Sequence, residues 1–325
     1  MNPYTLENLD PPMISSLGAP EPETSTGADD TLGDLIQNFG GPSLPEQPSL
    51  GGLLPAKSFL EFYGLSDNPF PDCVHPGFFY RTESHADAFR SMMLAVEFNA
   101  SLGMVTGPSG TGKTLVSQLV LQHLDTATYQ TVLVLVTPGL SKTGLLREIL
   151  SELNLGLPAG IARVQDLMKL LSNHIIDMYQ RGQRLVLIVD EAHLLEADCL
   201  HLIRTISNVE IPERKLTTCL LFGESRLAKR LEHPGYESLR NRIYMRGALK
   251  PLQADEVSQY VKFRFMVTGR MTPLFTSAGL AELHARSEGI CRTLNKLCMH
   301  CLIEGASRQE AMIDAPVVAA CAARL

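Results

Sequence analysis

Short apolar runs alternate with helix-periodic segments through the middle of this chain. Four of these runs have the length and composition of buried strands, and they lie at residues 102–106, 131–136, 185–189 and 217–222. Long segments with apolar residues at helical spacing separate them, the clearest near residues 141–153 and 164–180. Such alternation predicts an α/β fold, in which a parallel sheet carries helices on both faces.

The pattern changes after Pro251, where strand signals stop. The rest of the chain has apolar spacing typical of helices near residues 255–267, 277–287, 292–305 and 315–323. We therefore predict a small all-helical second domain. The expected division is an arm over residues 1–57, a nucleotide-binding domain over 58–248 and a helical domain over 249–325.

The first 57 residues contain nine of the twenty prolines and little apolar surface, which predicts a disordered arm. One segment in it has helical spacing between the capping candidates Asp30 and Gly40, with apolar residues Leu32, Leu35, Ile36 and Phe39. This segment is either a helix that docks into a groove of a protein partner or a transient helix without a partner.

The formal net charge of −7 comes from the arm, which carries eight acids and one base and leaves 27 of each for the rest. A neutral folded part neither requires nor excludes nucleic acid as a partner. The seven cysteines are irregularly spaced and no secretion signal is visible, so we expect a reduced, cytoplasmic protein. The apolar runs are shorter than the roughly 20 residues of a membrane helix.

The most specific motif follows the first predicted strand and matches G-x-x-x-x-G-K-[ST]. It consists of Gly107, Pro108, Ser109, Gly110, Thr111, Gly112, Lys113 and Thr114. The glycines allow backbone N–H groups to point at phosphate oxygens, and the next helix presents its positive end. Lys113 is expected to contact the β- and γ-phosphates and Thr114 to hold Mg²⁺. The alternative is an ordinary glycine-rich loop.

The third predicted strand ends in Asp190 and Glu191, the acid pair that a P-loop site requires. Asp190 is expected to bind Mg²⁺ directly or through its water, and Glu191 to orient and deprotonate the attacking water. The alternative is a pair of solvated acids that open a loop. Together with the P-loop, the pair predicts a nucleotide hydrolase that uses ATP or GTP. His193 completes a D-E-A-H tetrad, but the second motor lobe of a helicase is not visible.

These motifs belong to a wider resemblance. From Phe59 to about Cys301 the chain resembles the AAA+ ATPase module of the general secretion pathway protein A (ExeA) family, which is related to TniB-type transposition ATPases. Besides the P-loop and the D-E-A-H tetrad, the matching positions are residues 62–65, 68–70, 78–80, His85, 249–252, Glu256, Tyr260 and 289–295. The resemblance implies an αβα P-loop domain with a helical lid, with ATP and Mg²⁺ as cofactors.

The resemblance also implies roles for individual residues. Tyr63, Gly64 and Leu65, with Pro69 and Phe70, would border the adenine pocket. Arg292, at the start of a lid helix, would be the sensor-2 arginine that contacts the γ-phosphate.

Arg240 or Arg242 would act as an arginine finger in the site of a neighbouring subunit, which implies a ring or filament of identical subunits. The alternative is that these arginines pair with acids such as Glu237.

Two positions depart from the family pattern. Glu224 stands where the family usually has glutamine, and a carboxylate there would repel the γ-phosphate unless Mg²⁺ or an arginine such as Arg226 screens it. Cys291 replaces the usual proline before Arg292. Slow or partner-dependent hydrolysis is therefore expected.

Cys298 and Cys301 have a spacing that zinc ligands use. With Leu294, Leu297 and Leu302 they also follow helical spacing, and a second C-x-x-C pair is missing from the sequence. We interpret both cysteines as residues of a lid core.

Three functions remain open on these grounds. The leading one is an ATPase that drives assembly or remodelling of a larger, secretion-related complex. The second is an ATP-dependent regulator that binds DNA through the seven bases between Glu224 and Lys250, against three acids. The third is a nucleotide-gated interaction module with little turnover, for which Glu224 argues and Glu191 argues against.

Overall fold

A computed structural model describes residues 58–73, 76–156 and 163–325. The predicted arm, with its helical segment at residues 30–39, lies outside the described residues.

Within the described residues the main sheet has five strands, all parallel, in the order β2-β3-β6-β1-β7. The strands are β1 (Leu102–Gly107), β2 (Tyr129–Leu135), β3 (Arg184–Asp190), β6 (Thr217–Glu224) and β7 (Ile243–Ala248). The parallel sheet and the four predicted strands are confirmed. Sequence analysis missed β7, an edge strand in which buried or half-buried residues alternate with exposed ones such as Tyr244.

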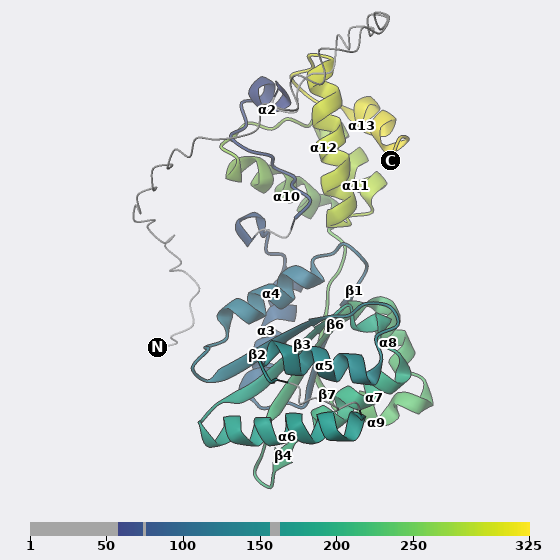
Figure 1. The fold of residues 1–325 in the computed structure, drawn as a ribbon. Coiled ribbons are helices and arrows are strands. Elements are labelled where there is room, and N and C mark those ends of the chain that lie inside the picture. The colour runs from purple at the N-terminus through teal and green to yellow at the C-terminus, as the bar shows by residue number, and fades with distance from the viewer. Residues whose placement is uncertain (1–57, 74–75, 157–162) are drawn as a thin grey trace, which may run out of the picture. The chain divides into compact units, whose positions relative to one another are not determined.

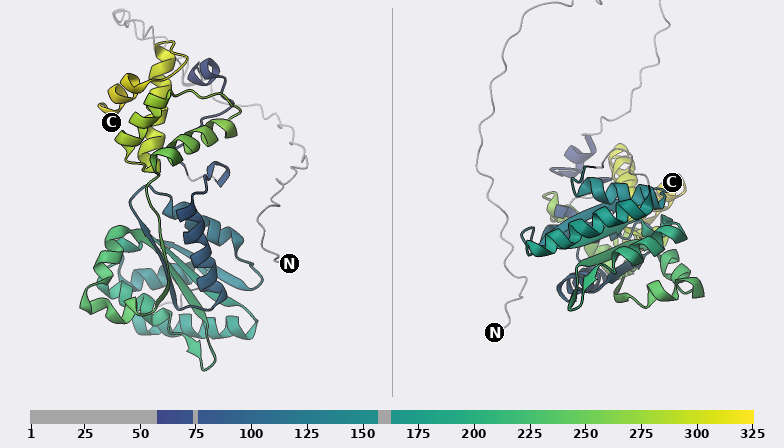
Figure 2. Two further views of the ribbon diagram at one scale, coloured as in Figure 1. Left: turned by 180° about the vertical axis from the view of Figure 1, so that it is seen from behind. Right: turned by 60° about the horizontal axis from the view of Figure 1, so that its bottom comes forward.

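Helices cover both faces of this sheet, as predicted (Figure 1). Helices α3 (Glu83–Glu97) and α4 (Lys113–His123) lie on one face, which is turned forward in the view from behind in Figure 2. The other face carries α5 (Lys142–Glu152), α6 (Val164–Gln180), α7 (Ala197–Ile206) and α8 (Ser225–Leu231). A short α9 (Glu237–Arg240) precedes β7, and a hairpin of β4 (Glu210–Ile211) and β5 (Arg214–Lys215) follows α7.

The central strand β3 shows why the sequence forms a buried sheet. Leu185, Leu187 and Val189 pack into the core on the α5–α6 side, whereas Val186 and Ile188 pack into the core on the α3–α4 side. Successive side chains of a strand point to opposite faces, so a strand covered on both faces must be apolar at every position. The carboxyl end of β3 is therefore the first place where its polar residues can appear.

Four C-terminal helices form the lid: α10 (Ala254–Val267), α11 (Ser277–Ser287), α12 (Cys291–Ser307) and α13 (Ala315–Ala322). They agree with the four helices predicted from the sequence. Cys298 and Cys301 are fully buried in the lid core, as their helical spacing indicates. Helix α12 begins at Cys291, directly before Arg292.

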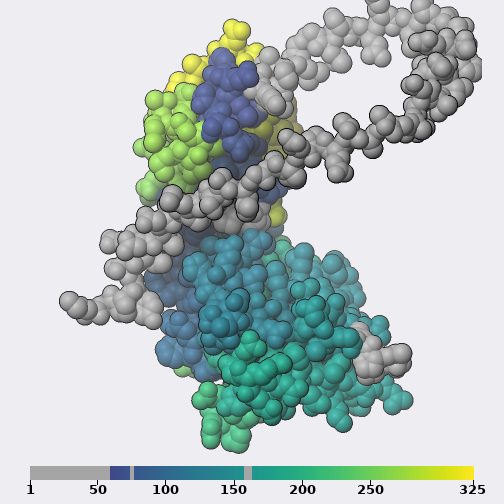
Figure 3. All heavy atoms as spheres, turned by 60° about the vertical axis from the view of Figure 1, so that its left-hand side comes forward, coloured from purple at the N-terminus to yellow at the C-terminus, as the bar shows by residue number. Residues whose placement is uncertain are grey.

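The N-terminal end of the described chain packs with the lid. Helix α2 (Ser58–Tyr63) packs against α12, and Phe59, Tyr63, Leu65 and Phe70 belong to the lid core. Figure 3 shows this purple segment against the green and yellow C-terminal helices. The predicted nucleotide-binding domain begins at residue 58, but the aromatic side chains that open it are buried by the lid.

Among the described residues, no helix combines the length and the apolar character that crossing a membrane requires.

Candidate functional site

The P-loop connects the end of β1 to the start of α4, as its motif predicts. Gly112, the N-cap of α4, has φ 96°, a left-handed conformation that side chains disfavour. At Gly107 a Cβ atom would lie 2.8 Å from the Leu249 carbonyl oxygen. Glycine is therefore required by conformation at one position and by space at the other.

Lys113 is the first residue of α4 and only 6% exposed. Its Nζ donates to the carbonyl oxygens of Gly107 (3.3 Å) and Pro108 (2.9 Å). Burial lowers the pKa of Lys113, because desolvation penalises its charge, while Glu191, Glu224 and Asp190 act in the opposite direction. The lysine is thus placed inside the loop that its motif assigns to phosphate.

A cavity of about 550 Å³ opens beside this loop. P-loop residues 109–114, including Ser109 and Thr114, line one part of it. Residues Phe70 to Cys73 and Phe78 to Tyr80 line a second part, and lid residues such as Tyr260, Arg292 and Asn295 line a third. Its volume lies in the range of about 300–1,000 Å³ that small-molecule sites occupy.

The two acids of the motif lie at the carboxyl end of β3. Asp190 is 2% exposed, and its Oδ1 accepts the backbone N–H of Glu191 at 2.8 Å. Glu191 adopts a left-handed backbone, with φ 55° and ψ 30°, and lines the cavity. The sequence motif thus corresponds to two different environments, one buried carboxylate and one that faces the cavity.

A buried histidine lies between two carboxylates at this edge. His193 Nδ1 is 3.3 Å from Glu191 Oε2 and accepts the Glu224 backbone N–H at 3.2 Å. Its Nε2 is 3.8 Å from Glu224 Oε2. Burial lowers the pKa of His193, opposed chiefly by Glu224. The imidazole is therefore hydrogen-bonded to the end of the neighbouring strand and lies beside the Glu191 carboxylate, a position that the sequence did not assign to it.

The Glu224 carboxylate has a cationic partner in this structure. Its Oε2 lies 3.0 Å from Arg226 Nε, the arginine that the sequence suggested as a screen.

Arg292 reaches the P-loop from the lid. Its backbone N–H donates to the Gly110 carbonyl oxygen at 3.2 Å, and Arg292 is one of the residues that line the cavity. The charge of Arg292 also contributes to the lowered pKa of Lys113, which indicates that the two cations lie near one another. Such a pair is stabilised by an anionic ligand between its members.

The resemblance predicts that Tyr63, Gly64 and Leu65 border the adenine pocket. These residues are not among those that line the cavity; Tyr63 is 1% exposed in the lid core, where its hydroxyl donates to the Glu310 carbonyl oxygen. Phe70, which the same resemblance named, does line the cavity, together with Pro71. The long Tyr63 side chain finds its apolar contacts under α12 rather than at the site.

Arg240 and Arg242 also lie outside the cavity lining. Arg240 donates to the Glu232 carbonyl oxygen at 3.0 Å. Arg242 donates to Asn208 Oδ1 and, at 3.4 Å, to the Arg204 carbonyl oxygen. The structure shows neither of them paired with Glu237, and it leaves the arginine-finger prediction untested.

Two further residues of the cavity wall had no predicted role. His85 contacts the P-loop backbone, and Arg264 is 4% exposed with its guanidinium close to the rings of Phe78 and Tyr260. Within the described chain, Arg264 Nε has no hydrogen-bond partner. No sequence signal marks Arg264, because it lies on an ordinary amphipathic helix.

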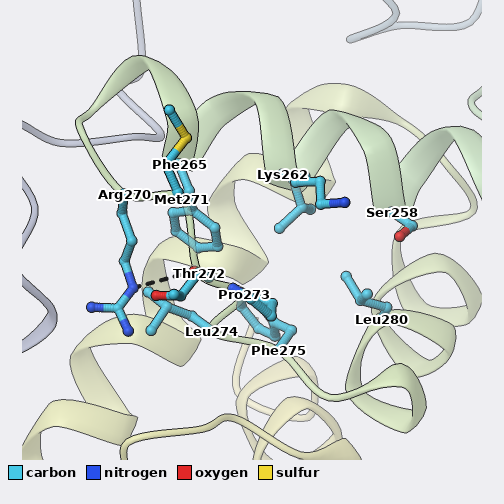
Figure 4. Close-up of a pocket in the computed structure, with 11 residues that line it drawn as sticks. Ser258, Lys262, Phe265, Arg270, Met271, Thr272, Pro273, Leu274, Phe275 and Leu280 are labelled. Atoms are coloured by element: carbon cyan, nitrogen blue, oxygen red, sulfur yellow. Dashed lines mark hydrogen bonds between the residues drawn. The ribbon is translucent and has the colours of Figure 1, made fainter.

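A second, smaller cavity of about 50 Å³ lies in the lid, between the C-terminal part of α10 and the loop that leads to α11 (Figure 4). Phe265, Pro273 and Leu280 line it, and Arg270 Nε donates to the Thr272 carbonyl oxygen at its edge. It is too small for a nucleotide.

The residues present suit a magnesium ion. Thr114 supplies a hydroxyl on the cavity wall and Asp190 a buried carboxylate at the end of β3, and Mg²⁺ prefers oxygen ligands of this kind.

Comparison with known proteins agrees with this architecture. Residues 96–231 match the family described as "AAA domain". General secretion pathway protein A of Aeromonas hydrophila is 34% identical over 252 residues, which are 77% of this chain and 45% of the relative. The chain therefore spans less than half the length of this relative.

Solved structures share the fold. The Aeropyrum pernix ORC2 protein in ADPNP–ADP complexes has a TM-score of 0.55 at 15% identity, covering 74% of this chain and 66% of that one. The Aeropyrum pernix ORC1 protein in complex with DNA has a TM-score of 0.58 at 19% identity, covering 79% and 68%.

Fold and P-loop together define the chain as an AAA+ protein of the P-loop NTPase class. Within that class, its sequence is similar to that of general secretion pathway protein A.

Proposed function

We propose that this chain binds ATP in the 550 Å³ cavity and hydrolyses it. The observation that carries the proposal is the convergence of Lys113, Glu191 and Arg292 on one cavity from three separate elements. The ORC2 relative, which is complexed with ADPNP and ADP, supports an adenine nucleotide.

Each residue has a distinct part in the proposed reaction. Lys113 and the P-loop amides bind the β- and γ-phosphates, and Arg292 contacts the γ-phosphate from the lid. Glu191 orients the attacking water and accepts its proton. Thr114 and Asp190 hold Mg²⁺, which supplies charge neutralisation at the phosphates when it is bound.

Glu224, which departs from the family pattern, affects the rate of hydrolysis that we expect. His193 lies 3.3 Å from the Glu191 carboxylate and 3.8 Å from that of Glu224, and Arg226 pairs with Glu224. Repulsion between a carboxylate and the γ-phosphate slows turnover, and Arg226 partly offsets it. We therefore expect slow hydrolysis in the isolated protein.

For the biological role, we propose that the ATPase cycle drives assembly or remodelling of a larger complex related to secretion. The sequence relationship with general secretion pathway protein A supports this role. Turnover in this proposal depends on identical subunits, since Arg240 and Arg242 lie outside the lining of their own cavity.

A second candidate is an ATP-dependent regulator that binds DNA. Four of the seven bases between Glu224 and Lys250 are exposed, namely Arg226, Lys229, Arg246 and Lys250. The ORC1 relative was solved in complex with DNA, which supports the same candidate at the level of the fold. Exposed bases on one segment are a starting point for phosphate contacts.

The test is the steady-state rate of ATP hydrolysis, measured with and without duplex DNA at low salt. We expect Glu191→Gln to reduce the rate by a factor of about 10² or more while nucleotide binding remains, because the variant keeps the shape but loses the proton acceptor. Glu196→Gln, an exposed acid five residues later, is the matched control and should keep the wild-type rate.

Three results would change the proposal. Equal rates for Glu191→Gln and the wild type would favour the nucleotide-gated module. Strong stimulation by DNA that weakens with salt would favour the DNA-binding regulator. Absence of ATP binding by the wild type would refute the ATPase altogether.

A further inference from the structure

His85 lies in the wall of the cavity, directly against the P-loop backbone. It is 4% exposed and sits in the first turn of α3. Its Nε2 is 2.9 Å from the Thr111 carbonyl oxygen. Its ring packs edge-on against Phe79, with centroids 5.7 Å apart. The imidazole thus contacts both the P-loop and the Phe79 ring.

Its surroundings determine which ring nitrogen carries the proton. A carbonyl oxygen only accepts hydrogen bonds, so Nε2 must be the protonated nitrogen that donates to Thr111. Nδ1 lies 2.6 Å from Thr82 Oγ1 and accepts from that hydroxyl in the neutral ring. Burial lowers the pKa of His85, which agrees with a neutral imidazole.

The contact has a consequence for the other end of the same peptide unit. The Thr111 carbonyl and the Gly112 N–H belong to one planar peptide, and the described residues contain no cis peptide bond. In a planar trans peptide these two groups point in opposite directions. A carbonyl held toward His85 therefore turns the Gly112 N–H away from the histidine, and Gly112 is one of the residues that line the cavity.

We propose that His85 is a positioning residue of the phosphate site: by holding the Thr111 carbonyl, it keeps the Gly112 N–H directed at the phosphates of the bound nucleotide. This inference rests on the proposed function, since it assigns the amide to a nucleotide phosphate. The gain is preorganisation, because the amide need not be reoriented when the ligand binds.

Close packing supports the same role. A Cβ atom on Gly112 would lie 2.9 Å from His85 Nε2, so the ring touches the loop at the residue whose amide it orients. The hydroxyl of Thr82 in turn accepts the His85 backbone N–H at 3.3 Å and caps α3. The start of α3 thereby fixes the ring.

A pair of amide substitutions separates positioning from packing. In His85→Gln the side-chain NH₂ reaches the place of Nε2, whereas in His85→Asn it reaches only the place of Nδ1. We expect His85→Asn and His85→Ala to bind a fluorescent ADP analogue about tenfold more weakly than the wild type, as loss of one buried hydrogen bond implies. His85→Gln should stay within about threefold, because it retains the donor.

Equal weakening by the Gln and Asn variants, or an unchanged affinity in both, would overturn the proposal. Thermal melting of each variant identifies one that has failed to fold. If the wild type itself binds no nucleotide, it is the proposed function that fails.

A second measurement needs no variant and no nucleotide. Imidazole ¹⁵N chemical shifts of the nucleotide-free protein at neutral pH should show His85 as the Nε2–H tautomer. The Nδ1–H tautomer would contradict the proposal, because a carbonyl cannot donate to an unprotonated Nε2.

Discussion

The candidate catalytic base carries a local conformational strain. Glu191 has φ 55°, a left-handed backbone that costs a non-glycine residue about 1–3 kcal/mol. The Asp190 carboxylate accepts the Glu191 N–H at 2.8 Å and so stabilises this conformation. With this backbone conformation, the Glu191 side chain lies at the cavity and beside His193.

His193 leads to a prediction about pH. Burial lowers its pKa in the folded protein, so the unfolded chain takes up a proton more readily. We therefore expect the free energy of unfolding to fall as the pH drops below about 6.5, the ordinary pKa of histidine, toward the lower folded value. Urea denaturation at several pH values measures this slope.

The variant His193→Asn provides the comparison for that slope. Its side-chain oxygen can still accept the Glu224 N–H, but it has no proton to gain in this range. The slope below about pH 6.5 should become shallower. A slope identical to that of the wild type would show that other groups are responsible, His85 among them.

Between elements, a close backbone contact joins two segments of the lid. The loop between α11 and α12 meets the segment between β7 and α10, where the Leu252 N–H donates to the Gly289 carbonyl oxygen at 2.9 Å. Gly289 has φ 70°, and a Cβ atom there would lie 2.0 Å from the Leu252 carbonyl oxygen. Arg292 follows three residues later, so this contact places the start of α12.

We expect Gly289→Ala to destabilise the fold by about 2–4 kcal/mol, because it combines a disfavoured backbone conformation with a clash against main chain. Gly182→Ala is the matched control. Gly182 has φ 81°, but no atom of the described residues lies within 4 Å of the position that its Cβ would take, so only the conformational cost of about 1 kcal/mol applies. Thermal or urea denaturation of the two variants measures the loss of stability in each. Equal losses of stability in the two variants would show that the Leu252 backbone shifts to make room for the added methyl group.

At the scale of the whole molecule, the proposed arginine fingers make a testable claim about assembly. Arg240 and Arg242 bond to groups of their own chain but lie outside the lining of its cavity. If one of them completes a neighbour's site, its loss should lower turnover by a factor of about 10³ or more.

Mixing two defective chains tests that claim. Arg242→Ala retains Glu191, and Glu191→Gln retains Arg242, so a mixed assembly contains some complete sites. ATP hydrolysis by the mixture should exceed that of either variant alone, whereas a chain with both substitutions should rescue neither. If Arg240→Ala and Arg242→Ala both keep wild-type turnover per subunit, the finger assignment is wrong.

Much of the fold could be predicted because the spacing of apolar residues along the sequence indicates which positions are buried. Strand β3 is apolar from Leu185 to Val189 and was found, whereas the edge strand β7 has exposed positions such as Tyr244 and was missed. The placement of α2 could not be predicted either, since aromatic residues such as Tyr63 can be buried by any neighbour.

By itself the sequence determined the parallel sheet, the lid helices and the residues of the P-loop and acid pair, because these depend on local spacing and on conformations that few residues allow. Only the tertiary structure decided which side chains surround the cavity. His85 and Arg264 meet there from distant parts of the chain. Contacts of this kind depend on how elements pack, and the pattern within any one element does not record them.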